Sequence, residues 1–195
     1  MLHHRLIDVD DSALIVIDVQ SRFLAKLPPD QSGALCQRVC WLIGVARWLG
    51  VPLVVTAEDI PKLGSVDSQV AQALPERTPI YNKLIFGLAG DRAILAALEQ
   101  TGRRTAILAG LETDVCVAQS ALGLLERGYR VGVVADATGS PGTAHAFGIE
   151  RMRDAGAIIT SVKGLFYEWV CSVERAERWH AECFNMLGAP EGVRL

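Results

Sequence analysis

The stretch that most constrains the fold runs from Arg104 to Gly128, RTAILAGLETDVCVAQSALGLLERG. Its first half, Thr105 to Leu111, is an apolar run, which is typical of a strand buried on both faces of a sheet. Its second half, Val115 to Arg127, carries apolar residues at helical spacing. A buried strand that turns directly into an amphipathic helix indicates a sheet covered by helices.

Cys116 lies in the first turn of that predicted helix. The N-terminus of a helix has unpaired N–H groups and a partial positive charge, which favour a thiolate over a thiol. The same N–H groups can hold an oxyanion that forms on a substrate carbonyl. Cys116 is therefore a candidate nucleophile. The alternative is an inert cysteine that fills the contact between helix and sheet.

Strand and helix patterns alternate along the whole chain, with no linker or repeat, so we expect one domain over residues 1–195. The alternation predicts an α/β fold, a doubly wound, Rossmann-like three-layer sandwich with a mostly parallel six-stranded sheet in the order 3-2-1-4-5-6. The predicted strands cover 13–19, 52–56, 79–83, 105–111, 130–135 and 157–162, and the predicted helices cover 32–49, 66–74, 91–100, 115–127, 143–155 and 173–187.

This strand order predicts where a site would form. The first and fourth strands become neighbours, and ligands bind beyond the carboxyl ends of the strands at that point. Asp18 ends the first strand and Cys116 follows the fourth, so an acid is expected beside the thiol. Lys83 follows the third strand and could join both in one charge network. The alternatives are a surface ion pair for Asp18, a solvated Lys83, and His145 as the base.

Composition excludes several functional classes. The net charge is −3, with no basic patch or motif for nucleic-acid binding, and no apolar run approaches the length of about 20 residues that spans a bilayer. The five cysteines are scattered, and the N-terminus does not resemble a signal peptide, so we expect reduced thiols in a cytoplasmic protein. Nucleotide-binding glycine motifs and the GxSxG elbow are absent, and no cofactor is predicted.

Three segments together resemble the isochorismatase-like cysteine hydrolase superfamily, which includes nicotinamidases and carbamoylsarcosine amidases. The segment Asp18-Val-Gln-Ser-Arg-Phe23 resembles the family's D-x-Q-x-x-F motif. Lys83-Leu-Ile-Phe-Gly87 resembles its K-x-x-F/Y-S motif, with glycine in place of serine. Gly110-Leu-Glu-Thr-Asp-Val-Cys-Val117 resembles the signature around its nucleophile. The three matches lie in the family's order and span most of the chain.

The resemblance implies a Cys116–Asp18–Lys83 triad. Asp18 would take the thiol proton and return it to the leaving amine, and Cys116 would form a thioester that water hydrolyses. The resemblance also implies a cis peptide bond between Leu111 and Glu112. That bond would direct the N–H groups of Glu112 and Cys116 toward the oxyanion.

Departures from the family pattern narrow the substrate. Zinc-dependent nicotinamidases carry a histidine where this chain has Ile60, and no histidine follows, so the resemblance implies no metal site. Glu112 stands where many amidases have alanine, as in a less characterised, metal-free subgroup. The expected activity is hydrolysis of a small amide or related acyl compound. The alternative is a non-catalytic binding or scaffold member of the same fold. The predicted substrate-binding residues are Phe23, Glu58, Ile85, Phe86 and Glu112.

The C-terminal helix favours assembly into a homo-oligomer, a dimer or a tetramer. Trp179 and Phe184 on this helix are expected to be buried against the sheet or a partner chain. A small-molecule substrate is the other expected partner.

Overall fold

The computed structural model describes residues 5–190, 192–193 and 195, without the side chains of 184–187. Its sheet has six strands in the order β3-β2-β1-β4-β5-β6, and every pair of neighbouring strands is parallel. The predicted α/β class and strand order are confirmed, and the sheet is wholly rather than mostly parallel. The strands are β1 Ser12–Ile17, β2 Leu53–Glu58, β3 Ile80–Lys83, β4 Thr105–Leu111, β5 Arg130–Gly139 and β6 Ile158–Thr160.

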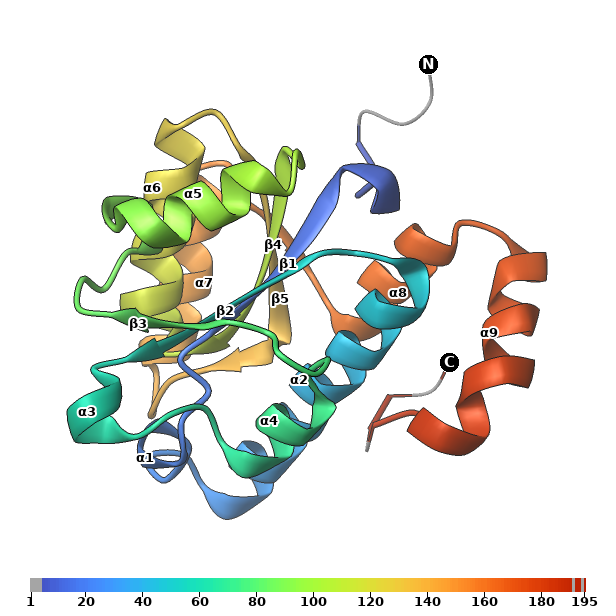
Figure 1. Ribbon diagram of the computed structural model, residues 1–195, viewed down its shortest axis with the longest axis horizontal. Coiled ribbons are helices and arrows are strands. Elements are labelled where there is room, and N and C mark those ends of the chain that lie inside the picture. The colour runs from blue at the N-terminus through green and yellow to red at the C-terminus, as the bar shows by residue number, and fades with distance from the viewer. Residues whose placement is uncertain (1–4, 191, 194) are drawn as a thin grey trace.

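Helices cover both faces of the sheet, as a wholly parallel sheet requires (Figure 1). One apolar core lies between the sheet and α2 and α8, and a second lies between the other face and α5, α6 and α7. The helices are α1 Ser21–Leu24, α2 Pro29–Leu49, α3 Ile60–Leu63, α4 Ser68–Ala73, α5 Arg92–Gln100, α6 Ala118–Glu126, α7 Ala144–Asp154, α8 Val162–Val170 and α9 Val173–Leu187, with 3-10 turns at Val9–Asp11 and Leu88–Gly90.

Three helices were not expected from the sequence. Helices α1 and α3 are short turns that follow β1 and β2 at the carboxyl edge of the sheet (Figure 1). Helix α8 lies mostly in a segment for which no element was predicted: β6 stops at Thr160, and Ser161 caps the new helix by accepting from the Gly164 N–H. The buried residues of α8 recur at helical spacing, a pattern that indicates a helix and that the sequence prediction overlooked.

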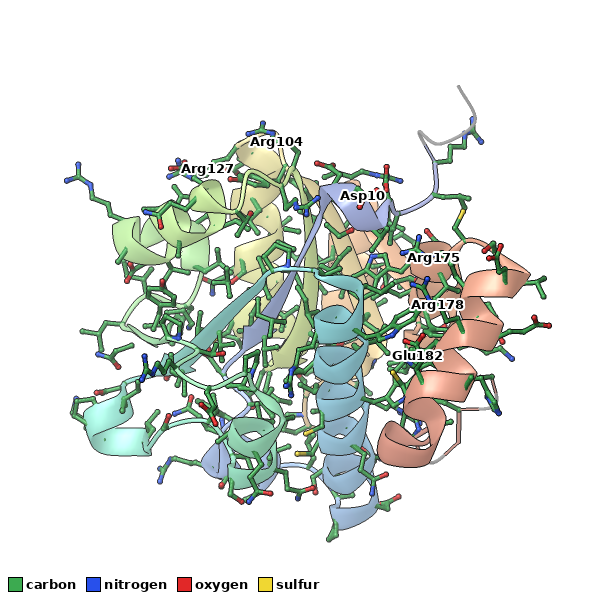
Figure 2. The ribbon with its side chains drawn as sticks, turned by 45° about the vertical axis from the view of Figure 1, so that its right-hand side comes forward. Asp10, Arg104, Arg127, Arg175, Arg178 and Glu182 are labelled. Carbon is green, nitrogen blue, oxygen red and sulfur yellow. The ribbon has the colours of Figure 1, made fainter. Side chains whose placement is uncertain are left out.

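Helix α9 packs outside α2 and α8 (Figure 1). Trp179 is buried, and its ring lies 5.5 Å from that of Trp41 and 5.0 Å from that of Phe166. Figure 2 shows Arg178 and Glu182 between α9 and α2, and Glu182 accepts a hydrogen bond from the Trp48 indole at 2.8 Å. The side chain of Phe184 lies outside the described residues, so its predicted burial stays a prediction.

The pairing of β1 with β4 determines where the site forms. Ile17 lies opposite Gly110, so the carboxyl ends of the two strands meet. Gly110 has a φ of 128°, and a Cβ atom there would lie 2.0 Å from the Ile17 carbonyl oxygen, so this close approach requires glycine. The segments that precede β1 and β4, marked by Asp10 and Arg104, lie at the opposite edge (Figure 2). The carboxyl edge therefore holds the candidate residues.

Candidate active site

Three buried, chemically active side chains meet at this edge. Asp18 follows β1, Lys83 ends β3, and Cys116 follows β4. The Lys83 ammonium lies 2.8 Å from Asp18 Oδ2 and donates to Cys116 Sγ at 3.5 Å. Asp18 and Lys83 are fully buried and Cys116 is 3% exposed. The predicted juxtaposition of acid, amine and thiol is therefore present in the structure.

Asp18 is held from both sides. Its Oδ1 accepts a hydrogen bond from the Thr56 hydroxyl at 2.8 Å, while Oδ2 faces Lys83. Asp18 has a left-handed backbone with a φ of 49°, a conformation that costs of order 1–3 kcal/mol and persists where the surroundings impose it. Sequence reasoning missed Thr56, although it lies in β2 opposite Ile17, next to the predicted acid.

Cys116 lies in a π-helical turn, Thr113–Val117, and the regular helix α6 begins only at Ala118. The Ser120 hydroxyl donates to the Cys116 carbonyl at 2.5 Å and accepts from the Leu88 N–H at 3.1 Å, which ties the turn to the segment after β3. The peptide bond between Leu111 and Glu112 is cis. The oxyanion role of the Glu112 and Cys116 N–H groups stays a prediction.

A second carboxylate contacts the thiol. The Cys116 S–H group donates to Glu58 Oε2 at 3.4 Å. Glu58 was predicted as a substrate-binding residue, and its contact with the nucleophile was not anticipated. Gln20 holds the Glu58 backbone: its Oε1 accepts from the Glu58 N–H at 2.8 Å, and its Nε2 donates to the Glu58 carbonyl at 2.9 Å. Gln20, the glutamine of the D-x-Q-x-x-F pattern, thus joins the ends of β1 and β2.

The electrostatics of the cluster favour a neutral thiol. Burial raises the pKa of Cys116, the negative charge of Asp18 raises it further, and Lys83 opposes these effects without outweighing them. Burial alone would lower the pKa of Lys83, but Asp18 and Cys116 raise it above its ordinary value. The expectation that the helix N-terminus favours a thiolate is therefore wrong for the resting protein, because burial and the carboxylates dominate.

This pKa shift predicts how Cys116 reacts with an alkylating reagent. Because its pKa is raised, the thiol is protonated at neutral pH, and its labelling by iodoacetamide should be slow there. The labelling rate should rise with pH without levelling off up to about pH 10, above the ordinary thiol pKa. Peptide mapping by mass spectrometry separates Cys116 from the exposed Cys171. Fast labelling of Cys116 at neutral pH, independent of pH, would contradict the neutral thiol.

The other predicted substrate-binding residues come from the segments that follow β1, β3 and β4. The Glu112 carboxylate is paired with Lys26 at 3.0 Å, and the same ammonium lies 4.7 Å from the centre of the Phe23 ring. Phe23 is buried, whereas Ile85 and Phe86, which follow Lys83, are about half exposed. The structure thus joins Phe23 to Glu112 through a lysine that sequence reasoning missed. The substrate-binding roles of these residues stay predictions.

His145 does not belong to the described contacts of the thiol. Its Nδ1 lies 2.9 Å from the Thr113 hydroxyl, and burial lowers the pKa of its imidazole. The carboxylates of Asp18 and Glu58, rather than His145, are the bases brought to Cys116.

The cluster has a donor set that could hold a cation. Ligand atoms of Asp18, Glu58 and Cys116 lie within 4.8 Å of one another. The Lys83 ammonium, however, already contacts Asp18 and Cys116, and so supplies a positive charge at the place where a metal would bind. A metal would have to share this space with an ammonium group. The sequence-based expectation of a metal-free site stays a prediction.

Comparison with known proteins identifies the family. Residues 12–164 match the isochorismatase domain. The chain belongs to the isochorismatase family. This isochorismatase-family protein is 33% identical over 166 residues to the secreted isochorismatase effector Isc1 of Phytophthora sojae, an alignment that covers 80% of this chain and 76% of that relative. The matched domain covers most of 1–195, and the assignment of a single domain to the whole range stays a prediction.

Two solved structures share the fold. The MAR1 ribonuclease of Caenorhabditis elegans is 29% identical with a TM-score of 0.83, and the alignment covers 97% of this isochorismatase-family chain and 98% of that chain. YcaC of Escherichia coli, described as an octameric hydrolase of unknown specificity, is 24% identical with a TM-score of 0.84, covering 93% of this chain and 90% of that one. YcaC therefore supports the fold alone.

None of the helices in the described part of this isochorismatase-family protein combines the length and apolar character needed to cross a membrane. The predicted cytoplasmic location stays a prediction, and the Phytophthora relative is a secreted protein by name.

Proposed function

We propose that this protein is a metal-free cysteine hydrolase that cleaves a small amide or related acyl compound through a thioester on Cys116. The observation that carries the proposal is the buried contact of Lys83 with both Asp18 and Cys116, at 2.8 and 3.5 Å. A thiol next to a carboxylate and a fixed ammonium has a proton acceptor and a positive charge for the developing oxyanion. Membership of a hydrolase family agrees with this chemistry.

The proposed reaction uses the three groups in order. The Cys116 sulfur attacks the acyl carbon, its proton passes to a neighbouring carboxylate, and the carbonyl oxygen becomes an oxyanion near Lys83. Collapse of this intermediate releases the amine or alcohol, which takes the proton. Water then cleaves the thioester. Asp18 is the carboxylate that the family resemblance assigns to the proton, and Lys83 keeps its charge because its pKa is raised.

The experiment uses nitrophenyl acetate and nitroacetanilide as chromogenic acyl probes. We expect release of nitrophenol or nitroaniline at a rate that does not change after dialysis against EDTA, because Lys83 rather than a metal supplies the positive charge. The metal content of the purified protein should be well below one ion per chain. Loss of activity on dialysis, restored by added zinc, would contradict a metal-free site. A chain inert toward every probe would support the non-catalytic alternative.

The proposal includes assembly of the chain into a homo-oligomer. Leu84, Ile85 and Phe86 form an exposed apolar segment directly after Lys83, with exposed fractions of 71%, 50% and 49%. Adjacent exposed apolar side chains of this size favour burial against another surface. The octameric state described for YcaC is consistent with such an assembly.

A further inference from the structure

Helix α2 carries two cysteines that the proposed reaction does not use. Cys36 and Cys40 are four residues apart, so their side chains leave the same face of the helix, one above the other. In a regular helix their Cα atoms are about 6 Å apart, within the range of about 4.4–6.8 Å over which a disulfide joins two cysteines. Both thiols are free in the structure. Two thiols so placed can react with each other without a partner from another element.

The two thiols differ in their access to solvent. Cys36 is 2% exposed and belongs to the apolar core between the sheet and α2. Cys40 is partly exposed and lines a surface cavity of about 310 Å³, whose wall includes Gln69 and Ala73 of α4 and Pro190. A small reagent can therefore reach Cys40 from solvent, whereas Cys36 is covered.

A neighbouring acid keeps the proton on Cys36. The Cys36 S–H group donates to Asp67 Oδ1 at 4.0 Å. The Asp67 carboxylate is itself fixed, because Oδ1 also accepts from the Gln69 N–H at 3.0 Å and Oδ2 accepts from the Ser21 hydroxyl at 2.8 Å. A negative charge beside a buried thiol opposes the loss of its proton. Cys36 is therefore the thiol of the two that stays protonated.

Cys40 is the thiol of the two that ionises more easily. A hydrogen bond from Cys36 lowers the pKa of Cys40 below its ordinary value, and this effect outweighs burial and the charge of Asp67. The same hydrogen bond, together with burial and the negative charges of Cys40 and Asp67, raises the pKa of Cys36. A partly exposed thiolate beside a protonated thiol is the arrangement of a peroxide-reactive cysteine with its resolving partner.

We infer that Cys36 and Cys40 form a peroxide-sensitive site, in which Cys40 is oxidised first and Cys36 converts it to a disulfide. The Cys40 thiolate attacks one oxygen of hydrogen peroxide, the O–O bond breaks, and hydroxide leaves a sulfenic acid on the sulfur. The Cys36 thiol then attacks the Cys40 sulfur, the S–O bond breaks, and the Cys36 proton leaves with the hydroxide as water. The two sulfurs are oxidised to one disulfide, and the peroxide is reduced to water.

The helix makes this disulfide easy to reduce again. Cβ atoms four residues apart on a helix are separated by about 5–6 Å. The Cβ atoms of a disulfide are only about 3.5–4.5 Å apart. Closing the bridge therefore distorts α2 locally, and strain of this kind favours reduction back to two thiols. The site suits a reversible modification rather than a structural crosslink.

The test treats the folded protein with hydrogen peroxide, blocks the remaining thiols with N-ethylmaleimide, and maps the denatured chain with trypsin. Trypsin cleaves after Arg38, which lies between the two cysteines, so Cys36 and Cys40 fall on separate peptides unless a disulfide joins them. We expect the joined peptides, two hydrogen atoms lighter than their sum, and their separation by dithiothreitol. They should form at a peroxide dose that leaves most of the exposed Cys171 reduced.

Two single variants identify the role of each cysteine. Cys36→Ser removes the resolving thiol with little change in size, so Cys40 should stop at the sulfenic acid and be captured by dimedone. Cys40→Ser leaves only the buried thiol, so dimedone capture at Cys36 should be several-fold lower. The Cys116→Ala background should give the same results, because neither step uses the proposed nucleophile. The unfolding midpoint of each variant, measured in urea, shows whether it has folded.

Two results would overturn the inference. One is recovery of Cys36 and Cys40 on separate peptides at a peroxide dose that oxidises Cys171. The other is dimedone capture at Cys36 in Cys40→Ser that equals the capture at Cys40 in Cys36→Ser, because the two thiols would then have no distinct roles. Neither result bears on the proposed hydrolase function, which fails only if Cys116 forms no acyl adduct.

Discussion

Replacement of Cys116 by alanine should abolish hydrolysis of nitrophenyl acetate. The sulfur forms the covalent bond in the proposed mechanism, and the loss of a comparable nucleophile lowers kcat by about 10⁴–10⁶-fold. The variant should still fold, because Cys116 contributes a small side chain at the edge of the apolar core between the sheet and α6. Steady-state rates and urea unfolding of the same preparation give both quantities.

The control for this prediction is Cys171→Ala. Cys171 is an exposed free cysteine in the turn between α8 and α9, on the helical layer formed by α2, α8 and α9. Its replacement should leave the rate unchanged. Retention of the wild-type rate by Cys116→Ala would end the assignment of Cys116 as the nucleophile. An equal loss of activity in both variants would point to a general effect of cysteine replacement.

Replacement of Lys83 by methionine should destabilise the protein and remove its activity. Methionine is unbranched like lysine and one atom shorter, and it leaves the Asp18 carboxylate buried without a counter-charge. Breaking a buried ion pair in this way costs about 3–5 kcal/mol of the free energy of unfolding, a large fraction of the about 5–15 kcal/mol that holds a domain together. Chemical denaturation with urea measures the change directly.

Two further variants separate the charge effect from packing. In the double variant Lys83→Met/Asp18→Asn neither partner is charged, so part of the lost stability should return while activity stays absent. Lys62→Met removes a lysine from the exposed pair with Asp59 and should change stability by less than about 1 kcal/mol. A Lys83→Met protein as stable as the wild type would show that Asp18 and Lys83 do not form a buried ion pair.

The sequence predicted the part of the site that depends on topology. Alternating strands and helices give one favoured strand order, and that order brings the end of β1 beside the end of β4. Asp18 and Cys116 were expected to be neighbours on this ground alone, and they are. The same reasoning placed Lys83, at the end of the third strand, at this edge of the sheet. The sequence left open whether the lysine side chain was buried.

The sequence did not predict what depends on side-chain direction and burial. Glu58 was expected to face a substrate, and the hydrogen bond that it accepts from Cys116 requires knowledge of where two side chains point. The raised pKa of Cys116 has the same origin, because the N-terminal position of a cysteine is visible in a sequence whereas its burial beside two acids is not. Helix α8 is a different kind of miss, because its buried residues recur at helical spacing in the sequence, at Val162, Leu165, Phe166, Trp169 and Val170.

The glycine at position 87 shows how packing explains a departure from the family motif. A Cβ atom at Gly87 would lie 3.0 Å from the carbonyl oxygen of Gln119 in α6. The serine that the family pattern carries there would therefore be crowded against a backbone atom in this chain. The sequence showed the departure, and the close approach of the segment after β3 to α6 supplies its reason.

Trapping of the acyl-enzyme tests the central claim most directly. The wild-type protein is mixed with nitrophenyl acetate, quenched in acid within the burst, and analysed by intact mass and peptide mapping. We expect one acetyl group per chain, located on the peptide that contains Cys116 and absent from the Cys116→Ala variant. An acetyl group found on another residue, with Cys116 unmodified, would contradict the account.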